Sequence, residues 1–581
     1  MKRRANKFKA ALKLESKMPS GKTVPGEPAV PLSTGRKWLF RFVAASLPFI
    51  VLLLVEIAFR VIPGLNEDRD PYVNISPISI FSRTMIAGQE YYNITHPWVI
   101  GGGGVHILVK KPANTIRIFC LGASACAGWP HPTTETFSAY LQQALEKAYP
   151  GKQVEVINAA AHGFAAYRVR HVLDEVVRMQ PDAIIVWSGN NEFLEDRNYD
   201  PPSAGIVSLA RHLRSFQWLR SVFTRQNQMS GKELKDVAQF FWKKTRQQSL
   251  RLRQDPVQFA QVQEHFRISI EHMVSQSQRY RVPIVLCTVP VNLRDWLPTV
   301  SYNRLNGEPF QQWQKLYNQA RRCLIEGKYH DGIQAMNQAI AMENEQAESY
   351  FWLGRLLEAD GQKAAAWEAF SKARDLDYNP FRAISSFNET IRVLAAENQH
   401  HGVYLLDLDH IFTGASRYAA PGFDLFLDYV HPTKPANLLV ARTAFDLITR
   451  DGVLKDKPAV NQFTYQDAST GPNGKPYREE TDLNLQTSGL TMATEARQYE
   501  TVLRKTESLL QEQTGHRLTG PDDPELKRFD PESAEKYHVF WNYLEVQRRV
   551  IMGLPVGETE LQDAKRRVDE YYEKWYPLGR Y

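Results

Sequence analysis

The sequence has few cysteines, and none of them is arranged as a metal site or a disulfide framework would require. Only four occur among the 581 residues, without a C-x-x-C spacing or a neighbouring histidine cluster. Zinc sites and disulfide-rich small domains depend on such spacings. Two of the four lie in expected core strands and one in an expected helix, so we expect small buried hydrophobic side chains at Cys120, Cys126, Cys287 and Cys323.

A phosphate-binding loop and a set of metal ligands are missing as well. The glycine run at 101–104 does not stand between a strand and a helix, so we interpret it as a flexible segment. We therefore expect no cofactor and no metal.

Strong positive charge is missing from most of the chain. The net charge is +7, but residues 1–41 alone hold eleven Lys and Arg against Glu15 and Glu27. The remainder is nearly neutral, which argues against a protein dedicated to nucleic-acid binding.

One long apolar run follows the basic segment. Residues 38–62 read WLFRFVAASLPFIVLLLVEIAFRVI, and their uncharged core from Phe42 to Val55 has fourteen residues. Roughly 20 are needed to cross hydrocarbon. Arg41 and Arg60 can extend their charged ends towards the headgroups, which makes about 20 residues available.

A signal anchor and a cleaved signal peptide are the two interpretations of this run. The basic segment is too long for a signal peptide, and no A-x-A-like site follows Ile62, so we favour the anchor. Glu56 would then lie close to one membrane boundary. The positive-inside rule predicts a cytoplasmic tail at 1–37 and export of everything after Pro63, into the periplasm if the protein is bacterial.

Strand-like and helix-like patterns alternate farther along the chain. Amphipathic segments at 136–150 and 165–180 follow the first two strand-like runs. Apolar strands separated by such helices are typical of a parallel sheet covered on both faces. The sequence thus predicts a three-layer α/β/α sandwich with five parallel strands, at 115–121, 154–160, 183–189, 283–289 and 403–409.

Small and polar residues follow four of these strands. Ser124 stands in LGASACAG after the first strand, Gly163 in NAAAHG after the second, and Asn190 in WSGNNE after the third. After the fifth, FLDYVHP places Asp428 three residues before His431. Because the carboxyl ends of parallel strands share one edge, we expect these residues to meet there.

This combination suits nucleophilic catalysis by serine. A hydroxyl needs an adjacent base, which His431 would supply, and Asp428 would orient the imidazole. The Ser124 and Gly163 N–H groups and the Asn190 amide would stabilise an oxyanion. Each residue also has a plainer interpretation: a helix cap for Ser124, a turn for Gly163, an Asx turn for Asn190.

In this order, the four motifs resemble those of the SGNH (GDSL) hydrolase superfamily. The chain departs from the family pattern at Ala123 and Asn191, where G-D-S and G-N-D usually have aspartate. Neither change removes a residue of the Ser124, Asp428, His431 triad. The resemblance implies hydrolysis of a carboxylic ester through an acyl-serine intermediate, and it covers 115–200, 265–296 and 385–450. Further polar residues are expected to shape the pocket: His131, His162, Glu192, Asn292 and Asp295.

Two insertions interrupt the sandwich. A basic helical stretch at 200–250 is either a surface helix packed on the domain or a helix on the membrane surface.

The second insertion is a repeat. Residues 313–346 align with 347–380 at a period of 34 and resemble tetratricopeptide (TPR) repeats. Two copies are too few to stand alone, so we expect them to pack on flanking helices. They either recruit a protein partner or roof the active site.

The predicted protein is an exported, membrane-anchored esterase acting on an acylated glycan or lipid. One alternative is transfer of the acyl group to a cell-envelope polysaccharide at the same site. The other is a scaffold whose repeats bind a partner beside an inactive site. The expected parts are a tail (1–37), an anchor (38–62), a linker (63–113), a hydrolase domain (114–312 and 381–452), repeats (313–380), a second linker (453–490) and a helical region (491–581).

Overall fold

The structure is a computed structural model, and it describes part of the chain. The described residues are 34–61, 79–96, 99, 105–194, 213, 215, 250–465, 490–494, 496–526 and 533–575. By contacts the chain forms two units, residues 1–69 with 211–219, and residues 70–210 with 220–581. Most of the expected tail, of the 200–250 helical insertion and of the 453–490 linker lies outside the described residues.

In the part of the first unit that the structure describes, residues 34–61 form one long helix, α2 (Thr34–Val61). By length and composition, its segment Arg41–Val61 is able to span a membrane. Glu56, the one acidic residue of the apolar run, is 6% exposed. Its carboxylate accepts hydrogen bonds from Arg60 Nε at 2.9 Å and from Ser215 Oγ at 2.9 Å. A charge in an apolar segment is tolerated when it is paired in this way.

A five-stranded parallel sheet forms the centre of the second unit. The strand order is β5-β4-β6-β7-β8, and each neighbouring pair is parallel, as the sequence predicted. The strands are β4 (Thr115–Gly122), β5 (Gln153–Asn158), β6 (Ala183–Trp187), β7 (Ile284–Cys287) and β8 (Val403–Leu406). Every residue of β4, β6 and β7 is buried, which explains their mostly apolar character. The four cysteines are buried too.

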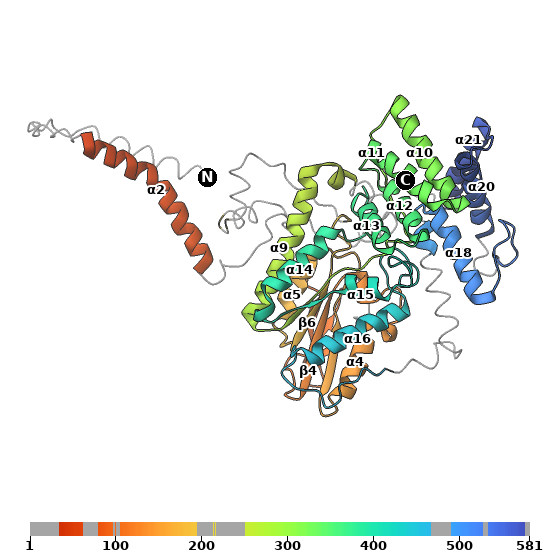
Figure 1. Ribbon diagram of the computed structural model, residues 1–581. Helices are drawn as coiled ribbons and strands as arrows, with labels where there is room; N and C mark the ends of the chain where they lie inside the picture. Colours follow the sequence, from red (N-terminus) through yellow and green to blue (C-terminus); the bar gives the residue numbers. More distant parts are fainter. Residues whose placement is uncertain are drawn as a thin grey trace, which may run out of the picture. The chain divides into compact units, whose positions relative to one another are not determined.

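Helices cover both faces of this sheet (Figure 1). On one face α4 (Phe137–Ala148) packs against α16 (Lys434–Arg450). On the other, α9 (Pro256–Tyr280) packs against α5 (Ala166–Val176) and α14 (Ser385–Glu397). The result is the expected three-layer sandwich, with the carboxyl ends of the strands along one edge.

The segment expected to be an irregular linker at 63–113 contains a small sheet, so that prediction was wrong. Its strands β1 (Phe81–Ile86), β2 (Gln89–Ile94) and β3 (His106–Leu108) are antiparallel. Ala87 and Gly88 join the first two with φ values of 48° and 81°, the positive values that tight hairpins favour. Most residues of β1 are exposed, so the strand lacks the apolar alternation that would have revealed it.

Four helices occupy the region of the predicted repeats. They are α10 (Gly307–Glu326), α11 (Tyr329–Met342), α12 (Ala347–Ala359) and α13 (Lys363–Asp375). They pack as the hairpins α10–α11 and α12–α13. The aligned small residues lie where helices touch: a Cβ on Gly354 would be 2.7 Å from the Phe370 ring, and one on Gly332 would be 2.6 Å from Leu356 Cδ2. The TPR assignment itself stays a prediction.

The C-terminal part is helical and contacts these hairpins. Its longer helices are α18 (Tyr499–Thr514), α20 (Ser533–Ile551) and α21 (Glu558–Trp575). Helix α10 packs on α20, where Arg322 Nε donates to the Ile551 carbonyl at 3.0 Å. The hairpins therefore pack on flanking helices, as their small number requires.

Gly122 allows β4 and β6 to approach closely at the end of the sheet. A Cβ at this position would lie 2.1 Å from the Trp187 carbonyl oxygen and 2.7 Å from Cys126 Cβ. We expect Gly122→Ala to lower the free energy of unfolding by about 1–3 kcal/mol, as overpacking does. Urea unfolding measures this. Gly151→Ala is the matched control, because a Cβ there meets nothing within 4 Å. Equal effects of the two changes would contradict the explanation.

Candidate active site

Three side chains from the two ends of the α/β domain form one hydrogen-bonded chain. His431 Nε2 lies 2.9 Å from Ser124 Oγ, and His431 Nδ1 lies 2.6 Å from Asp428 Oδ2. Because a carboxylate can only accept, Nδ1 carries the hydrogen, and the Nε2 lone pair faces the Ser124 hydroxyl. Asp428 is fully buried and His431 nearly so, whereas Ser124 is half-buried.

Short elements after β4 and β8 place these residues. Ser124 begins α3 (Ser124–Ala127), whose N-cap is Ala123 without a side-chain bond. The Ser124 hydroxyl is bonded to His431, so it does not cap this helix. Two residues after His431, Thr433 caps α16 by accepting the Ala436 N–H. The cap ties the segment that bears His431 to a helix of the sandwich.

The Asp428 carboxylate is held in its ionised form. Complete burial acts to raise the pKa of Asp428, but His431 and the hydrogen bonds the carboxylate accepts hold that pKa below its usual value. Two of these bonds come from the Val430 and His431 N–H groups to Oδ1, at 2.8 and 2.9 Å. The D-x-x-H spacing thus lets the aspartate bind both the backbone and the ring of the histidine.

The three expected oxyanion donors follow the adjacent strands β5, β4 and β6. Gly163 has φ 69°, a conformation that favours glycine. Among the described residues, no hydrogen bond partner occupies the N–H groups of Ser124 or Gly163. The Asn190 Oδ1 accepts the Ala383 N–H at 3.0 Å, which orients the amide NH₂ away from Ala383.

Side chains join the loops that carry these donors. Asn158 Nδ2 reaches Ser138 Oγ at 3.0 Å and the Cys126 and Ala127 carbonyls at 3.3 Å, which links the second loop to the first. Asn191 Nδ2 donates to the Phe164 carbonyl at 3.1 Å, which links the third loop to the second. Asn191 therefore has a structural partner of its own.

Three of the polar residues expected to shape the pocket make hydrogen bonds to backbone groups. Glu192 accepts the Ala166 N–H at 2.8 Å, at the start of α5. Asn292 is fully buried and donates to the Asp428 carbonyl at 2.9 Å. Asp295 is buried in a cluster of arginines. Their polar groups have partners within the protein.

Aromatic rings surround the imidazole of His431. The Trp129 ring lies 4.6 Å from it, and the Tyr429 ring lies 6.0 Å away. His162 is half-buried against Trp129, with ring centroids 6.1 Å apart. His131 Nε2 contacts the Pro432 carbonyl at 2.8 Å. With these neighbours, His431 is only 3% exposed.

The chain was compared with known proteins. No family model and no curated protein matches it. Among solved structures, it is similar to a member of the lipolytic protein G-D-S-L family from Veillonella parvula DSM 2008, at 10% identity and a TM-score of 0.26, over 58% of this chain and 99% of that one. An acetyl xylan esterase, AlAXEase, is similar at 11% identity and a TM-score of 0.26, over 57% of this chain and 100% of that one.

A third similar structure is LAE5, an alpha/beta hydrolase enzyme from the metagenome of Lake Arreo, Spain. It is 10% identical, with a TM-score of 0.26, over 58% of this chain and 95% of that one. Identities and TM-scores at this level carry no function across. The function is therefore inferred from the geometry of the site.

Sequence reasoning missed two residues that contact the site. Trp129 stands directly after the small-residue loop, and a bulky ring ending that loop was an available signal. Lys505 lies on α18 and contacts the Leu427 carbonyl, next to Asp428. No local pattern indicates this contact, because Lys505 stands in an ordinary amphipathic helix far along the chain.

Burial lowers the pKa of His131 to about 4. Its Nδ1 is buried without a hydrogen bond partner among the described residues, so protonation there is unfavourable. In the unfolded chain the imidazole titrates near 6.5. Between pH 6.5 and 4 the unfolded state thus binds the extra proton, and stability falls as the pH is lowered through that window.

We expect His131→Gln to remove up to about 3 kcal/mol of this pH dependence, the equivalent of the pKa difference. The free energy of unfolding in urea, measured from pH 7 to pH 4 for both proteins, checks this. Parallel curves for the wild type and the variant would show that His131 titrates normally in the folded state.

Proposed function

We propose that the protein is a serine esterase that hydrolyses carboxylic esters through an acyl-serine intermediate. The observation that carries the proposal is the hydrogen-bonded chain from Ser124 through His431 to Asp428. This arrangement of hydroxyl, imidazole and buried carboxylate activates a serine for attack on an acyl carbon.

In the first half of the reaction, the Ser124 oxygen forms a bond to the ester carbonyl carbon while its proton moves to His431 Nε2. Asp428 stabilises the imidazolium through the Nδ1–H bond. The tetrahedral intermediate then breaks its bond to the leaving oxygen, which takes the proton from His431. Water repeats these steps on the acyl-serine and releases the carboxylic acid.

The negative oxygen of each tetrahedral intermediate needs donors that are in place beforehand. The Ser124 and Gly163 N–H groups and the Asn190 NH₂ group follow three neighbouring strands and would supply them. The bond from Ala383 to Asn190 Oδ1 keeps that amide from rotating, so its donor does not have to be oriented during the reaction.

The same proposal includes the location of the enzyme and the class of its substrate. The apolar α2 would anchor the chain once, with the basic tail in the cytoplasm and the catalytic domain outside. An anchored enzyme meets esters near the membrane, so we propose O-acylated glycans or lipids of the envelope as substrates. The helical hairpins would present a surface for a partner protein.

The nucleophile can be tested without knowing the substrate. We expect a fluorophosphonate probe to label the wild type and not Ser124→Ala, because only an activated serine attacks the phosphorus. Ser82→Ala is a matched control, since Ser82 is an exposed serine of β1, outside the site, and should leave labelling intact. The wild type and the control variant should hydrolyse p-nitrophenyl acetate, and Ser124→Ala should not. Equal labelling of wild type and Ser124→Ala would refute the proposal.

Asn190 tests the oxyanion site. Asn190→Asp keeps the acceptor for the Ala383 N–H but replaces the NH₂ donor with an oxygen that repels an oxyanion. We expect kcat on p-nitrophenyl acetate to fall by about 10²–10³-fold, the usual effect of losing one donor. KM should change little, because the donor acts on the transition state. An unchanged kcat would place the oxyanion elsewhere.

A further inference from the structure

The segment that carries Asp428 and His431 is held by its backbone carbonyls. Four carbonyls between residues 427 and 432 each have a partner from another part of the chain. The pairs are Leu427 with Lys505 Nζ, Asp428 with Asn292 Nδ2, Tyr429 with the Asn292 N–H, and Pro432 with His131 Nε2. Three of these four bonds come from two loops of the α/β domain, those that carry Asn292 and His131. Lys505 comes from the C-terminal helical region.

Lys505 is built into the interior. It lies on α18 and is 2% exposed, and its Nζ is 4.4 Å from the centre of the Phe423 ring. A buried ammonium group is costly unless hydrogen bonds and a favourable ring contact replace water. The Leu427 carbonyl and the Phe423 ring, both from the segment just before His431, provide these contacts.

Helix α18 also docks on the residues that follow Asn292. Thr501 Oγ1 donates to the Asp295 carbonyl at 3.2 Å, and Gln498 Nε2 donates to the Leu297 carbonyl at 3.3 Å. Arg504 reaches the Asp295 carboxylate at 3.8 Å. The face of α18 that holds Lys505 is thus fixed at several points along its length.

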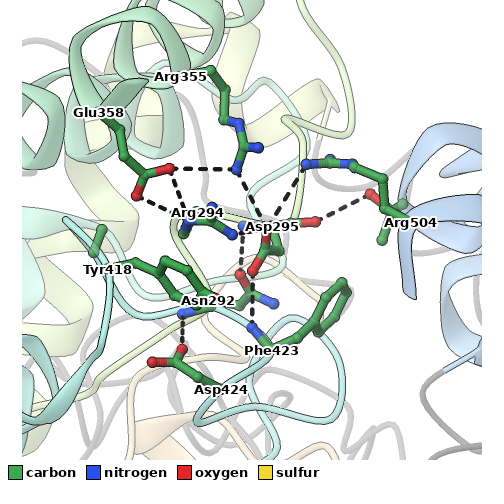
Figure 2. Close-up of polar contacts among 12 residues, drawn as sticks. Asn292, Arg294, Asp295, Arg355, Glu358, Tyr418, Phe423, Asp424 and Arg504 are labelled. Carbon is green, nitrogen blue, oxygen red and sulfur yellow. Dashed lines mark hydrogen bonds and ion pairs between the residues drawn. The ribbon is translucent and has the colours of Figure 1, made fainter. Parts of the chain in front are cut away.

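The Asp295 carboxylate lies at the centre of this docking site (Figure 2). Arg294 and Arg355 approach it at 2.8 and 3.6 Å, and its Oδ2 accepts the Phe423 N–H at 3.0 Å. Gly422 allows this approach, since a Cβ there would lie 2.2 Å from Asp295 Oδ2. Arg355 belongs to α12 and Arg504 to α18, so one carboxylate joins both helical regions to the loop before His431.

We propose that Lys505 is a positioning residue of the esterase site, an inference that rests on the proposed function. Helix α18 completes the site because its Lys505 holds the Leu427 peptide in place through the carbonyl oxygen. The Leu427 N–H donates to the His431 carbonyl at 2.8 Å, while its carbonyl binds Lys505. Movement of this peptide therefore moves both ends of the D-x-x-H turn. Lys505 itself does not touch the reacting atoms.

Lys505→Met in the full-length protein tests this, because Met keeps most of the apolar stem and removes the donor. We expect kcat on p-nitrophenyl acetate to fall by about 10- to 100-fold, as for a catalytic group displaced slightly, with KM nearly unchanged. Hydrogen exchange of peptides covering 423–433 should become faster, while exchange in α4 stays as in the wild type. Lys565→Met, an exposed lysine of α21, is the matched control and should change neither.

Thr501→Val is a second variant that keeps the volume and removes the hydroxyl that contacts the Asp295 carbonyl and Gln498 Oε1. It should also lower kcat, but by less than Lys505→Met. If Lys505→Met does not fold, Thr501→Val is the variant that tests the positioning role. Unchanged exchange at 423–433 overturns the clamp whatever the activity. Faster exchange with unchanged kcat overturns the positioning role. An inactive wild type that no fluorophosphonate labels refutes the proposed function, and the positioning role with it.

Discussion

The whole domain is organised around one contact, the 2.9 Å approach of His431 to Ser124, which stand 307 positions apart in the sequence. A parallel sheet makes this approach achievable, because each strand delivers its following loop to the same edge. The central position of β4, between β5 and β6, puts Ser124 between the loops that carry Gly163 and Asn190. The bonds of Asn158, Asn191 and Asn292 then hold neighbouring loops to one another.

Two buried aspartates near this edge are stabilised in different ways. Asp428 is held by a single ring and two amides, and the ring can change its charge during a reaction. Asp295 is surrounded by three arginines, whose charges are permanent. The charge next to Asp428 can change when His431 gains or loses a proton. The charges around Asp295 stay constant, which suits a structural junction between the loop before His431, the helical hairpins and α18.

The sequence predicted the sheet because β4, β6 and β7 are buried on both faces and so consist of nearly continuous apolar runs. Once the strands were located, the residues that follow each strand were known as well. The order of these polar motifs along the chain then indicated Ser124, Asp428 and His431. The β1–β3 sheet was not predictable in this way, since β1 is mostly exposed. Nor were the roles of Asn292, Asp295 and Lys505, which depend on which distant segments pack together.

The position of Lys505 has a consequence for how the protein is made. Ser124 leaves the ribosome about 380 residues before Lys505 does, an interval of roughly 20 to 75 s at ordinary rates of synthesis. During that time β4 and its loop can form, but the turn bearing the base has no anchor from α18. A nascent chain therefore carries Ser124 long before it carries every partner of the 427–432 segment.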